Sequence, residues 1–404
     1  MNRPPVILTH QKLAVPYDYP VAFTRGIFDP GNELLRDTVD RLAEKRRHRV
    51  LVCLDAGVAK VDPALPARIT RYFKAHAATL ELAGRIETVK GGESSKTDLN
   101  TMTRAIGWMA KRKLCRHSVV MVIGGGSLLD VMGLAASLVH RGLRVVRVPT
   151  TVVAQNDVGV GVKTGIDYLG AKNFLGTFAP PFAVLNDFDF LDVLPQRDWV
   201  AGIAEAFKVA MIKDRRFFRS LCAQAAALRR RDRAAMEKLV ITCARLHLDH
   251  IRRGGDPFET GSARPLDFGH WSAHQLEVMS GYTLRHGEAV AIGLALDSFY
   301  AAAKGLLPRK ELGALLTGLR EAGLPIWHPL LGRRASDGSL AVLRGLETFR
   351  EHLGGALTVT LPAPVGRRVE VHSLDHRTLT EGVAFLKAYA HSEASHNNHT
   401  GVSI

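Results

Sequence analysis

The sequence predicts an α/β domain with an open parallel sheet, followed by an all-α domain. In the first half of the 404-residue chain, short apolar runs alternate with amphipathic stretches, which is the pattern of βαβ units. Several runs are apolar at every position, as expected of strands that are covered on both faces. After about Asp189 helical spacing dominates.

Four strands are predicted in the first half, at residues 49–54, 118–123, 144–148 and 183–185. Helical patterns lie between them, near residues 33–47, 64–76, 99–112 and 128–140. Open sheets of this kind bind ligands at the carboxyl ends of their strands. We therefore expect a ligand site in the loops that follow these strands.

The second half shows helical spacing with turn residues between the helices. The predicted helices are residues 197–212, 215–228, 233–253, 271–279, 288–303 and 309–322. The tail is polar and lacks an apolar period, so we expect it to be mobile. The predicted organisation is an α/β domain at 1–189, a helical domain at 190–390 and a flexible tail at 391–404.

The composition indicates a globular protein, since 46% of the residues are hydrophobic and 23% are charged. The longest apolar stretch, residues 119–139, contains a glycine triplet and Asp130, which argues against a membrane span. Residues 1–10 hold no long apolar segment, and the four cysteines are far apart. A cytoplasmic protein with reduced thiols is therefore expected.

The net charge of +15 is compatible with nucleic acid or with anionic small molecules such as phosphates. The basic runs at 111–113 and 229–231 lie in helical stretches without interleaved aromatic residues. A solvated surface explains such runs better than a nucleic-acid groove does. We therefore expect no nucleic-acid partner.

A glycine-rich turn follows the strand at residues 118–123. The triplet at 124–126 leads into a helix that includes Asp130, and a phosphate can approach such a backbone at the positive end of the helix. The turn alone is equally compatible with a structural role. Asp55, at the end of an earlier strand, and the polar turn at 91–96 favour a dinucleotide and hence a Rossmann-like domain.

The loop after residue 148 is rich in residue types that bind ligands. It contains Thr150, Thr151, Asp157, Lys163, Lys172 and Asn173. Such loops often bind ligands, although turn chemistry explains part of them. Glu205 and Lys208 lie three residues apart on the next helix, where they form either a surface ion pair or a buried pair that faces a ligand.

Histidines of the second half indicate a metal site. His270 and His274 are one helical turn apart, and His286 opens the next helix. Each of them alone is more often an ordinary interior or surface histidine. Together with Glu205 they indicate Zn²⁺, because three protein ligands leave a position open for a substrate oxygen.

In this order the motifs resemble those of the sugar phosphate cyclases, whose best-known members are the 3-dehydroquinate synthases. The likeness covers about residues 49–304 and rests on Gly124, Gly125, Gly126, Asp130, Arg141, Gly142, Pro149, Thr150, Thr151, Asp157, Lys163, Thr164, Lys172, Asn173, Ala204, Glu205, Lys208, Gly269, His270, His286, Gly287 and Glu288. Residues 133–137 also resemble the 2-epi-5-epi-valiolone synthases. Residues 173–181 and 254–258 resemble the cyclase encoded in bacterial and algal ebo clusters.

The resemblance implies two cofactors, NAD and Zn²⁺, with Co²⁺ as another possible metal. NAD would be bound by Asp55, Glu93, Lys96, Gly125, Gly126, Ser127, Asp130, Thr150, Thr151, Asp157 and Lys172. The metal would be bound by Glu205, His270 and His286. The fold implied is that of a dehydroquinate synthase, with an all-α domain that binds the metal.

The resemblance also implies the catalytic residues, which are Lys163, Lys208, His274, Asp267, Asn173 and Arg264. The substrate phosphate would be bound by Asn173, Lys208, His274 and Arg141, the last from the neighbouring subunit of a homodimer.

The reaction implied leaves NAD unchanged overall. A ring hydroxyl is oxidised, phosphate is eliminated, the ketone is reduced again, and the opened sugar closes in an aldol step. Oxidation comes first because the new ketone acidifies the neighbouring C–H bond, which lets phosphate leave.

Departures from the 3-dehydroquinate synthases bear on the substrate. Asp267 stands where they have Asn, and His247 where they have Lys; their carboxylate-binding Arg aligns with Ala263, although Arg264 is adjacent. An added negative charge and a lost cation disfavour a substrate carboxylate. We therefore expect a neutral ketose phosphate similar to sedoheptulose 7-phosphate.

Other positions make the chain a hybrid. His274 is retained, whereas valiolone-type cyclases have Pro there, and either Arg350 or His352 is expected to replace the family's C-terminal lysine.

Three alternatives stay open. The first is a 3-dehydroquinate synthase that acts on 3-deoxy-D-arabino-heptulosonate 7-phosphate. The second is a metal-dependent dehydrogenase of the glycerol dehydrogenase type, a group that lacks the phosphate-binding residues at 172–173 and 208. The third is a catalytically silent binding protein that keeps the cyclase fold.

Overall fold

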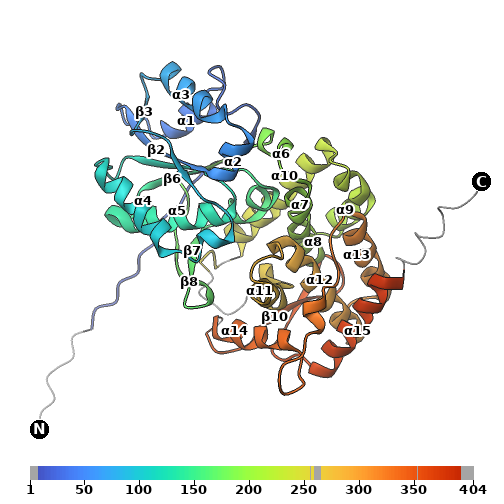
Figure 1. Ribbon diagram of the computed structural model, residues 1–404. Helices are drawn as coiled ribbons and strands as arrows, with labels where there is room; N and C mark the ends of the chain where they lie inside the picture. Colours follow the sequence, from blue (N-terminus) through green and yellow to red (C-terminus); the bar gives the residue numbers. More distant parts are fainter. Residues whose placement is uncertain (1–7, 255, 259–264, 353, 393–404) are drawn as a thin grey trace, which may run out of the picture.

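The computed structural model describes residues 8–254, 256–258, 265–352 and 354–392. Two parts lie side by side, a sheet part from β1 to β9 and a helical part from α6 onward (Figure 1). The last strand of the central sheet, β9, ends at Asp187, and the helices that follow build the second part. A parallel-sheet part is therefore followed along the chain by a helical part.

The central sheet is parallel throughout. Its strands are β1 (Val21–Thr24), β2 (His48–Asp55), β3 (Leu80–Leu82), β4 (Glu87–Val89), β5 (Val119–Gly124), β6 (Arg144–Pro149) and β9 (Ala183–Asp187). They lie in the order β1-β9-β6-β5-β2-β3, with β4 also beside β2. The four predicted strands are confirmed, whereas β1, β3 and β4 are additional.

Both faces of the sheet are covered by helices. The helices of this part are α1 (Leu34–Val39), α2 (Ala56–Val61), α3 (Leu65–Ala75), α4 (Leu99–Lys111) and α5 (Gly126–Leu138). In β5, Val120 and Val122 pack in one apolar cluster with α4 and α5, whereas Met121 and Ile123 pack in another with α1 and α3. Burial on both sides explains why these strands are apolar at every position.

The register places the ends of three neighbouring strands at one edge. Leu54 of β2 pairs with Ile123 of β5, and Gly124 of β5 pairs with Pro149 of β6. The loops after these strands carry the glycine triplet and the threonines that the sequence singled out. The carboxyl edge of the sheet is therefore where the candidate residues meet.

The helical part consists of α6 (Asp189–Asp192), α7 (Gln196–Ala201), α8 (Ile203–Lys213), α9 (Arg215–Arg229), α10 (Arg233–Arg253), α11 (His270–Met279), α12 (His286–Ala303), α13 (Arg309–Glu321), α14 (Arg344–His352) and α15 (His376–Ser392). Side-chain caps fix the residues at which two of these helices begin. Asp214 accepts hydrogen bonds from the amides of Arg216 and Phe217 at α9, and Asp232 from that of Ala235 at α10. One large apolar cluster joins these helices.

Two predicted helices differ from the structure. The helix predicted at 197–212 is divided into α7 and α8 at Gly202, where a Cβ would lie 2.4 Å from the Cβ of Val152. The helix predicted at 33–47 ends at Val39, and positive φ angles at Ala43 and Lys45 carry the chain out of the helical region.

A β-hairpin replaces part of the irregular loop predicted after residue 148. Its strands are β7 (Lys163–Tyr168) and β8 (Ala171–Phe178), and Gly165 lies opposite Gly176. A Cβ at Gly176 would lie 2.6 Å from the carbonyl oxygen of Thr164. Glycines permit this close approach of the strands, and they also hide the apolar alternation by which a strand is recognised.

The helical part also contains a hairpin, β10 (Val359–Pro362) with β11 (Arg368–Val371), so it is not all-α in the strict sense. The predicted tail begins inside α15, which extends through Ser392, and residues 393–404 lie outside the described residues. Among the helices of the described chain, none has both the length and the apolar character needed to cross a bilayer.

Candidate active site

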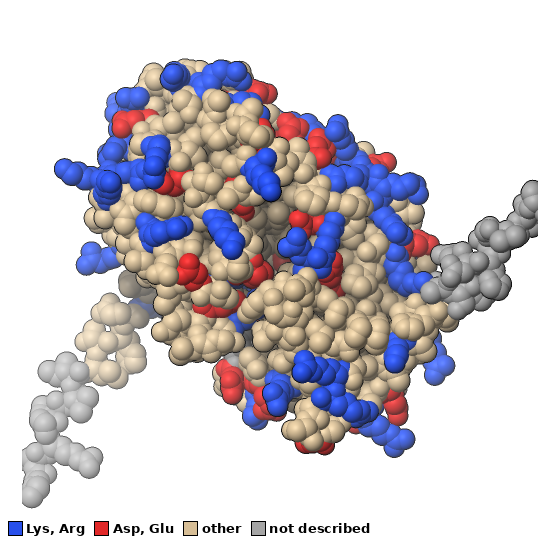
Figure 2. Space-filling view, viewed as in Figure 1, with Lys and Arg blue, Asp and Glu red and all other residues tan. Residues whose placement is uncertain are grey.

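A cleft of about 940 Å³ runs between the two parts of the molecule. Figure 2 shows a hollow there, with acidic and basic side chains around it. The predicted NAD-binding residues all line this cleft, namely Asp55, Glu93, Lys96, Gly125, Gly126, Ser127, Asp130, Thr150, Thr151, Asp157 and Lys172. The other predicted residues that line it are Lys163, Asn173, Lys208, Asp267, His270, His274 and His286.

Glycines let the loops on the sheet side of the cleft pack closely. A Cβ at Gly91 would lie 2.0 Å from the carboxylate of Asp55, and a Cβ at Gly126 would lie 2.6 Å from Val158. Asp55 also accepts a hydrogen bond from the amide of Gly57 (2.7 Å) and so caps α2. Gly125, Gly126 and Ser127 at the start of α5 line the cleft, and the amino end of a helix is a place where a phosphate group can bind.

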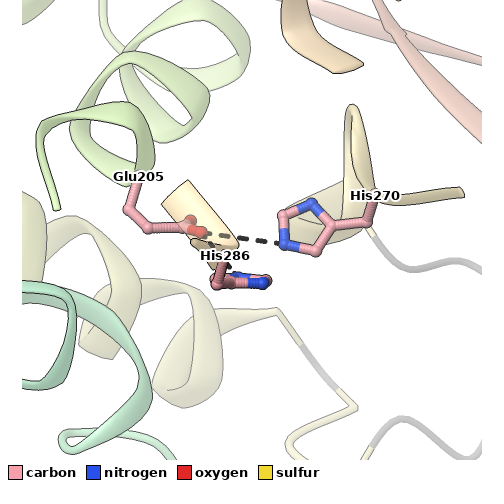
Figure 3. Close-up of side chains that lie close together, drawn as sticks. All are labelled: Glu205, His270 and His286. Carbon is pink, nitrogen blue, oxygen red and sulfur yellow. Dashed lines mark ion pairs between the residues drawn. The ribbon is translucent and has the colours of Figure 1, made fainter. Parts of the chain in front are cut away.

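Three helices bring Glu205, His270 and His286 together (Figure 3). Nε2 of His286 lies 3.2 Å from Oε1 of Glu205, and Nε2 of His270 lies 3.8 Å from the same oxygen. Glu205 comes from α8, whereas the histidines open α11 and α12. Ligand atoms of all three lie within 4.8 Å of one another.

The chemistry of these residues fits a bound Zn²⁺. Both carboxylate oxygens of Glu205 are buried without a hydrogen-bond partner, although the Lys208 ammonium lies 2.5 Å away. Nδ1 of His270 lies 3.0 Å from the carbonyl oxygen of Phe268, so its Nε2 faces Glu205. Two imidazoles and one carboxylate form a common ligand set of catalytic zinc.

His286 stands between two carboxylates. Its Nδ1 lies 3.1 Å from Oε2 of Glu277, which is fully buried. Burial opposes the charged ring, but Glu277 and Glu205 outweigh it and raise the pKa of His286 to about 10. The surroundings therefore favour a cation at this position, and a divalent metal would replace the proton.

Lys172 belongs to β8 of the sheet part, but its ammonium forms an ion pair on the helical side of the cleft. Its ammonium donates a hydrogen bond to Oε1 of Glu277 (2.7 Å). Burial works against its charge, yet Glu277 and then Glu93 raise the pKa of Lys172. The residue predicted to bind NAD thus connects the hairpin of the sheet part to a neighbour of the metal site.

The buried Lys96 joins the buried Asp130 to Asn173, which is exposed. The Lys96 ammonium donates to Oδ2 of Asp130 (2.8 Å) and to Oδ1 of Asn173 (2.5 Å). Asn173 adopts a positive φ of 52°, and its amide donates to Asp167 (2.8 Å). These contacts join predicted NAD residues to a predicted phosphate residue.

Asp157 connects the sheet part to α8 and α10. It forms an ion pair with Lys208 (3.4 Å) and a short hydrogen bond with Nδ1 of His247. Burial would raise the pKa of this carboxyl, but Lys208 and His247 hold it well below the ordinary value. Conversely, Asp157 and Glu205 outweigh burial and raise the pKa of Lys208.

The remaining predicted residues are placed as follows. His274 lies with its ring centroid 5.3 Å from that of His270, and Asp267 borders the helical side of the cleft. Arg141 is exposed and does not line the cleft, and Arg264 lies outside the described residues. Arg350 pairs with Glu347 on α14 (2.5 Å).

Two positioning residues were missed by the sequence reasoning. Glu277 follows His270 by seven residues and His274 by three, so helical spacing already placed it on their face. Arg147, fully buried in β6, donates to the carbonyls of Gly159 (3.1 Å) and Gly161 (2.6 Å) and holds the segment that carries Asp157. An arginine inside a strand otherwise apolar was the available signal.

Comparisons with known proteins agree with this geometry. The family model described as the 3-dehydroquinate synthase N-terminal domain matches residues 86–201, and its C-terminal counterpart matches residues 202–343. A 2-epi-5-epi-valiolone synthase of Streptomyces glaucescens is 34% identical over 359 residues, which cover 88% of this chain and 87% of the relative. A 3-dehydroquinate synthase of Xanthomonas campestris pv. campestris is 32% identical over 379 residues, covering 91% of this chain and 95% of the relative.

Among solved structures, a 2-epi-5-epi-valiolone synthase of Streptomyces hygroscopicus subsp. jinggangensis 5008, with NAD⁺ and Zn²⁺ bound, superposes with a TM-score of 0.83 at 29% identity. The match covers 94% of this chain and 99% of that one. The resemblance to the sugar phosphate cyclases and to the 2-epi-5-epi-valiolone synthases is confirmed, and so is the fold that it implied. The chain belongs to the 3-dehydroquinate synthase family of sugar phosphate cyclases.

Proposed function

We propose that this protein is an NAD- and Zn²⁺-dependent carbon–oxygen lyase that cyclises a neutral ketose phosphate, of the sedoheptulose 7-phosphate type, and releases phosphate. One observation carries the proposal. A single cleft is lined by His270 and His286, which share one potential ligand set with Glu205, by buried lysines and by the glycine-rich edge of the sheet. Transient oxidation, phosphate elimination, reduction and aldol closure need all three components in one place.

The residues present fit both cofactors. NAD would lie along the carboxyl edge of the sheet, at Asp55, the start of α5 and the threonines after β6, and would accept and return a hydride. Zn²⁺, or Co²⁺, would be held by Glu205, His270 and His286 and would polarise the substrate oxygen.

The cleft supplies charge and proton transfer for phosphate elimination. Lys208 keeps its charge because its pKa is raised by Asp157 and Glu205 against burial, so it can bind and orient an anionic group. Burial, and then Lys172, hold the pKa of His274 well below the ordinary value. Its imidazole is therefore neutral near pH 7. Because it is a weak base, it can relay a proton while phosphate leaves but does not retain it.

Asp267 argues for a substrate without a carboxylate. It lines the cleft, and its charge acts on both Lys208 and His270. A substrate carboxylate beside it would bring like charges together in a partly dry site. His247 also argues against a substrate carboxylate, because its imidazole is already bound to Asp157.

Phosphate release by the purified protein with NAD and Zn²⁺ tests the proposal. Sedoheptulose 7-phosphate and 3-deoxy-D-arabino-heptulosonate 7-phosphate are offered in parallel. Release from the first alone is the expected result, and Asp267→Asn should lower kcat/KM for it by about tenfold or more, equivalent to about 1.4 kcal/mol. Turnover that is indifferent to Asp267→Asn would refute the argument from charge.

A 3-dehydroquinate synthase is the second candidate. The 32% identical relative with that name and the retained His274 favour it. Release from 3-deoxy-D-arabino-heptulosonate 7-phosphate alone would establish it, whereas stoichiometric NADH would point to a dehydrogenase. A purified protein that shows no turnover and holds neither NAD nor metal would be the catalytically silent binding protein.

We further propose that the protein acts as a homodimer in the cytoplasm. Exposed apolar side chains occur at the end of α5, at Leu138, and in the β7–β8 hairpin, at Leu169 and Leu175, and a second subunit would cover such side chains. Arg141 lies at the same end of α5 and outside the cleft of its own chain. It would act on the phosphate of the neighbouring subunit.

A further inference from the structure

Glu277 is a buried carboxylate that joins the two parts of the molecule. Oε2 lies 3.1 Å from Nδ1 of His286, and Oε1 accepts a hydrogen bond from Lys172 (2.7 Å). Glu277 is 0% exposed, and the side chain of Lys172 is 10% exposed. Lys172 comes from β8, whereas Glu277 and His286 come from α11 and α12.

We propose that Glu277 positions His286 for the metal and that Lys172, through Glu277, lets the β7–β8 hairpin set the metal affinity. The inference rests on the metal site of the proposed function and is independent of the identity of the sugar. Both residues act through His286, and neither is assigned to the reacting atoms.

The imidazole of His286 has two nitrogens, and only one can face Glu205. A hydrogen bond from Nδ1 to a carboxylate fixes the tautomer in which Nε2 carries the lone pair. In this chain that nitrogen lies 3.2 Å from Oε1 of Glu205. Glu277 therefore orients the ring and increases its basicity as a ligand.

Lys172 makes the buried carboxylate possible. A carboxylate without exposure is costly unless an opposite charge and hydrogen bonds compensate it. Lys172 provides both, because its ammonium donates a hydrogen bond to Oε1 of Glu277 at 2.7 Å. Moving the hairpin would remove this compensation, and with it the partner that orients His286.

Glu277 also lies near enough to His274 and His286 to be considered a ligand itself. Its hydrogen bonds argue otherwise. Its oxygens are already taken up by Lys172 and Nδ1 of His286, whereas Oε1 of Glu205 faces Nε2 of both His270 and His286. A metal on Glu277 would have to displace the contact with Nδ1 of His286.

The test measures metal binding without substrate. Zn²⁺ dissociation constants of full-length wild type, Glu277→Gln, Lys172→Met and Lys172→Arg are determined by competition with a chromophoric chelator, and visible spectra of the Co²⁺ forms are recorded. We expect Glu277→Gln to weaken Zn²⁺ by about 10–100-fold while the Co²⁺ spectrum keeps its shape. Lys172→Met should weaken it less, and Lys172→Arg should retain most of the affinity.

Glu87→Gln is the matched control. Glu87 is also buried and ion-paired, with Arg112, but lies on β4 outside the cleft. Its variant should bind Zn²⁺ like the wild type. The double variant Glu277→Gln/Lys172→Met should be no weaker than Glu277→Gln alone, because Lys172 acts through Glu277.

Several results would overturn the inference. These are wild-type affinity in both Glu277→Gln and Lys172→Met, additive losses in the double variant, or a Co²⁺ spectrum that indicates a lost ligand in Glu277→Gln. If Glu277→Gln does not fold, the inference is decided by the Zn²⁺ affinities of Lys172→Met, which should be weaker, and of Lys172→Arg, which should be close to the wild type. A wild type that binds no Zn²⁺ would refute the proposed function too, whereas a wild type that binds Zn²⁺ without turnover would leave this inference standing.

Discussion

At the scale of residues, the cleft is organised by alternating buried charges. Lys208 lies between Glu205 and Asp157, and Lys172 is bound to Glu277. Removing one member of such a group leaves an uncompensated charge, which costs about 3–5 kcal/mol in comparable buried pairs. Conservative changes that keep shape are therefore needed to separate chemistry from folding.

His270→Ala should abolish metal binding and turnover together. A metal that binds only the folded chain stabilises it by about 2.7 kcal/mol at a concentration 100 times its dissociation constant. We expect Zn²⁺ to raise the Tm of the wild type and not that of the variant. His117→Ala, at an exposed histidine paired with Glu44, is the control, and an active metal-free His270→Ala would contradict the ligand assignment.

Asp297 predicts a pH-dependent stability. Its buried carboxylate accepts hydrogen bonds from Trp271 (2.8 Å) and from the amide of Gly269 (3.0 Å) beside His270. Burial raises the pKa of Asp297 from 3.8 to about 7. The folded chain therefore holds this proton longer than the unfolded chain does, and the stabilisation is complete below about pH 4 and lost as the pH rises through 7.

The stability of the wild type relative to Asp297→Asn should fall across this window, with a slope of at most about 1.4 kcal/mol per pH unit. Urea unfolding of both proteins at about pH 5 and about pH 8 measures the difference, since Asn does not titrate. A difference that is constant with pH would show that the carboxyl ionises normally.

At the scale of elements, close helix packing presents the proposed metal ligands. A Cβ at Gly293 of α12 would lie 2.0 Å from the carbonyl oxygen of Gly269, and one at Gly287 would lie 1.8 Å from that of Ala201. The absence of side chains at these positions lets α12 approach α7 and the start of α11. His270 and His286 are thereby brought to a single point.

Gly293→Ala should consequently destabilise the protein, because a backbone oxygen cannot move aside. Overpacking of this kind costs about 1–3 kcal/mol, visible as a lower urea midpoint and weaker Zn²⁺ binding. Gly313→Ala on α13 is the control, since nothing lies within 4 Å of its added Cβ. There alanine should stabilise by about 0.5–1 kcal/mol, and equal midpoints for the two variants would contradict the packing argument.

At the scale of the whole molecule, the active site belongs to neither part alone. The sheet part supplies the glycine turn and Lys172, whereas the helical part supplies the proposed metal ligands. Lys172–Glu277 and Asp157–Lys208 cross between them. These two ion pairs thus connect the sheet side of the cleft to its helical side.

The proposed dimer is a prediction at this scale. Leu138 is 53% exposed and follows Ser137, whose hydroxyl lies 3.1 Å from that of Thr177 on β8. Leu138→Glu should convert a dimer to a monomer by light scattering, because a charge would be buried in the interface. Leu42→Glu, at another exposed leucine, should leave the mass unchanged. A monomeric wild type would refute the dimer.

Sequence periodicity sufficed for the central strands and most helices, because their burial repeats locally. It failed for β7 and β8, where Gly165 and Gly176 interrupt the pattern. The metal set was predicted from histidine spacing and the resemblance. Glu277 was missed because its partner Lys172 is 105 residues away, and only the folded chain places a charge of the sheet part beside it.

The two ion pairs that cross the cleft restrict how relatives of this chain can be recombined. A chimera joined near Gly202 would take Asp157 and Lys172 from one parent and Lys208 and Glu277 from the other. A half inherited from a parent with a different residue at any of these positions would leave its partner as an isolated charge in a dry interior. Successful chimeras will therefore be those whose two parents carry the same residues at all four positions, whatever the overall sequence identity of the parents.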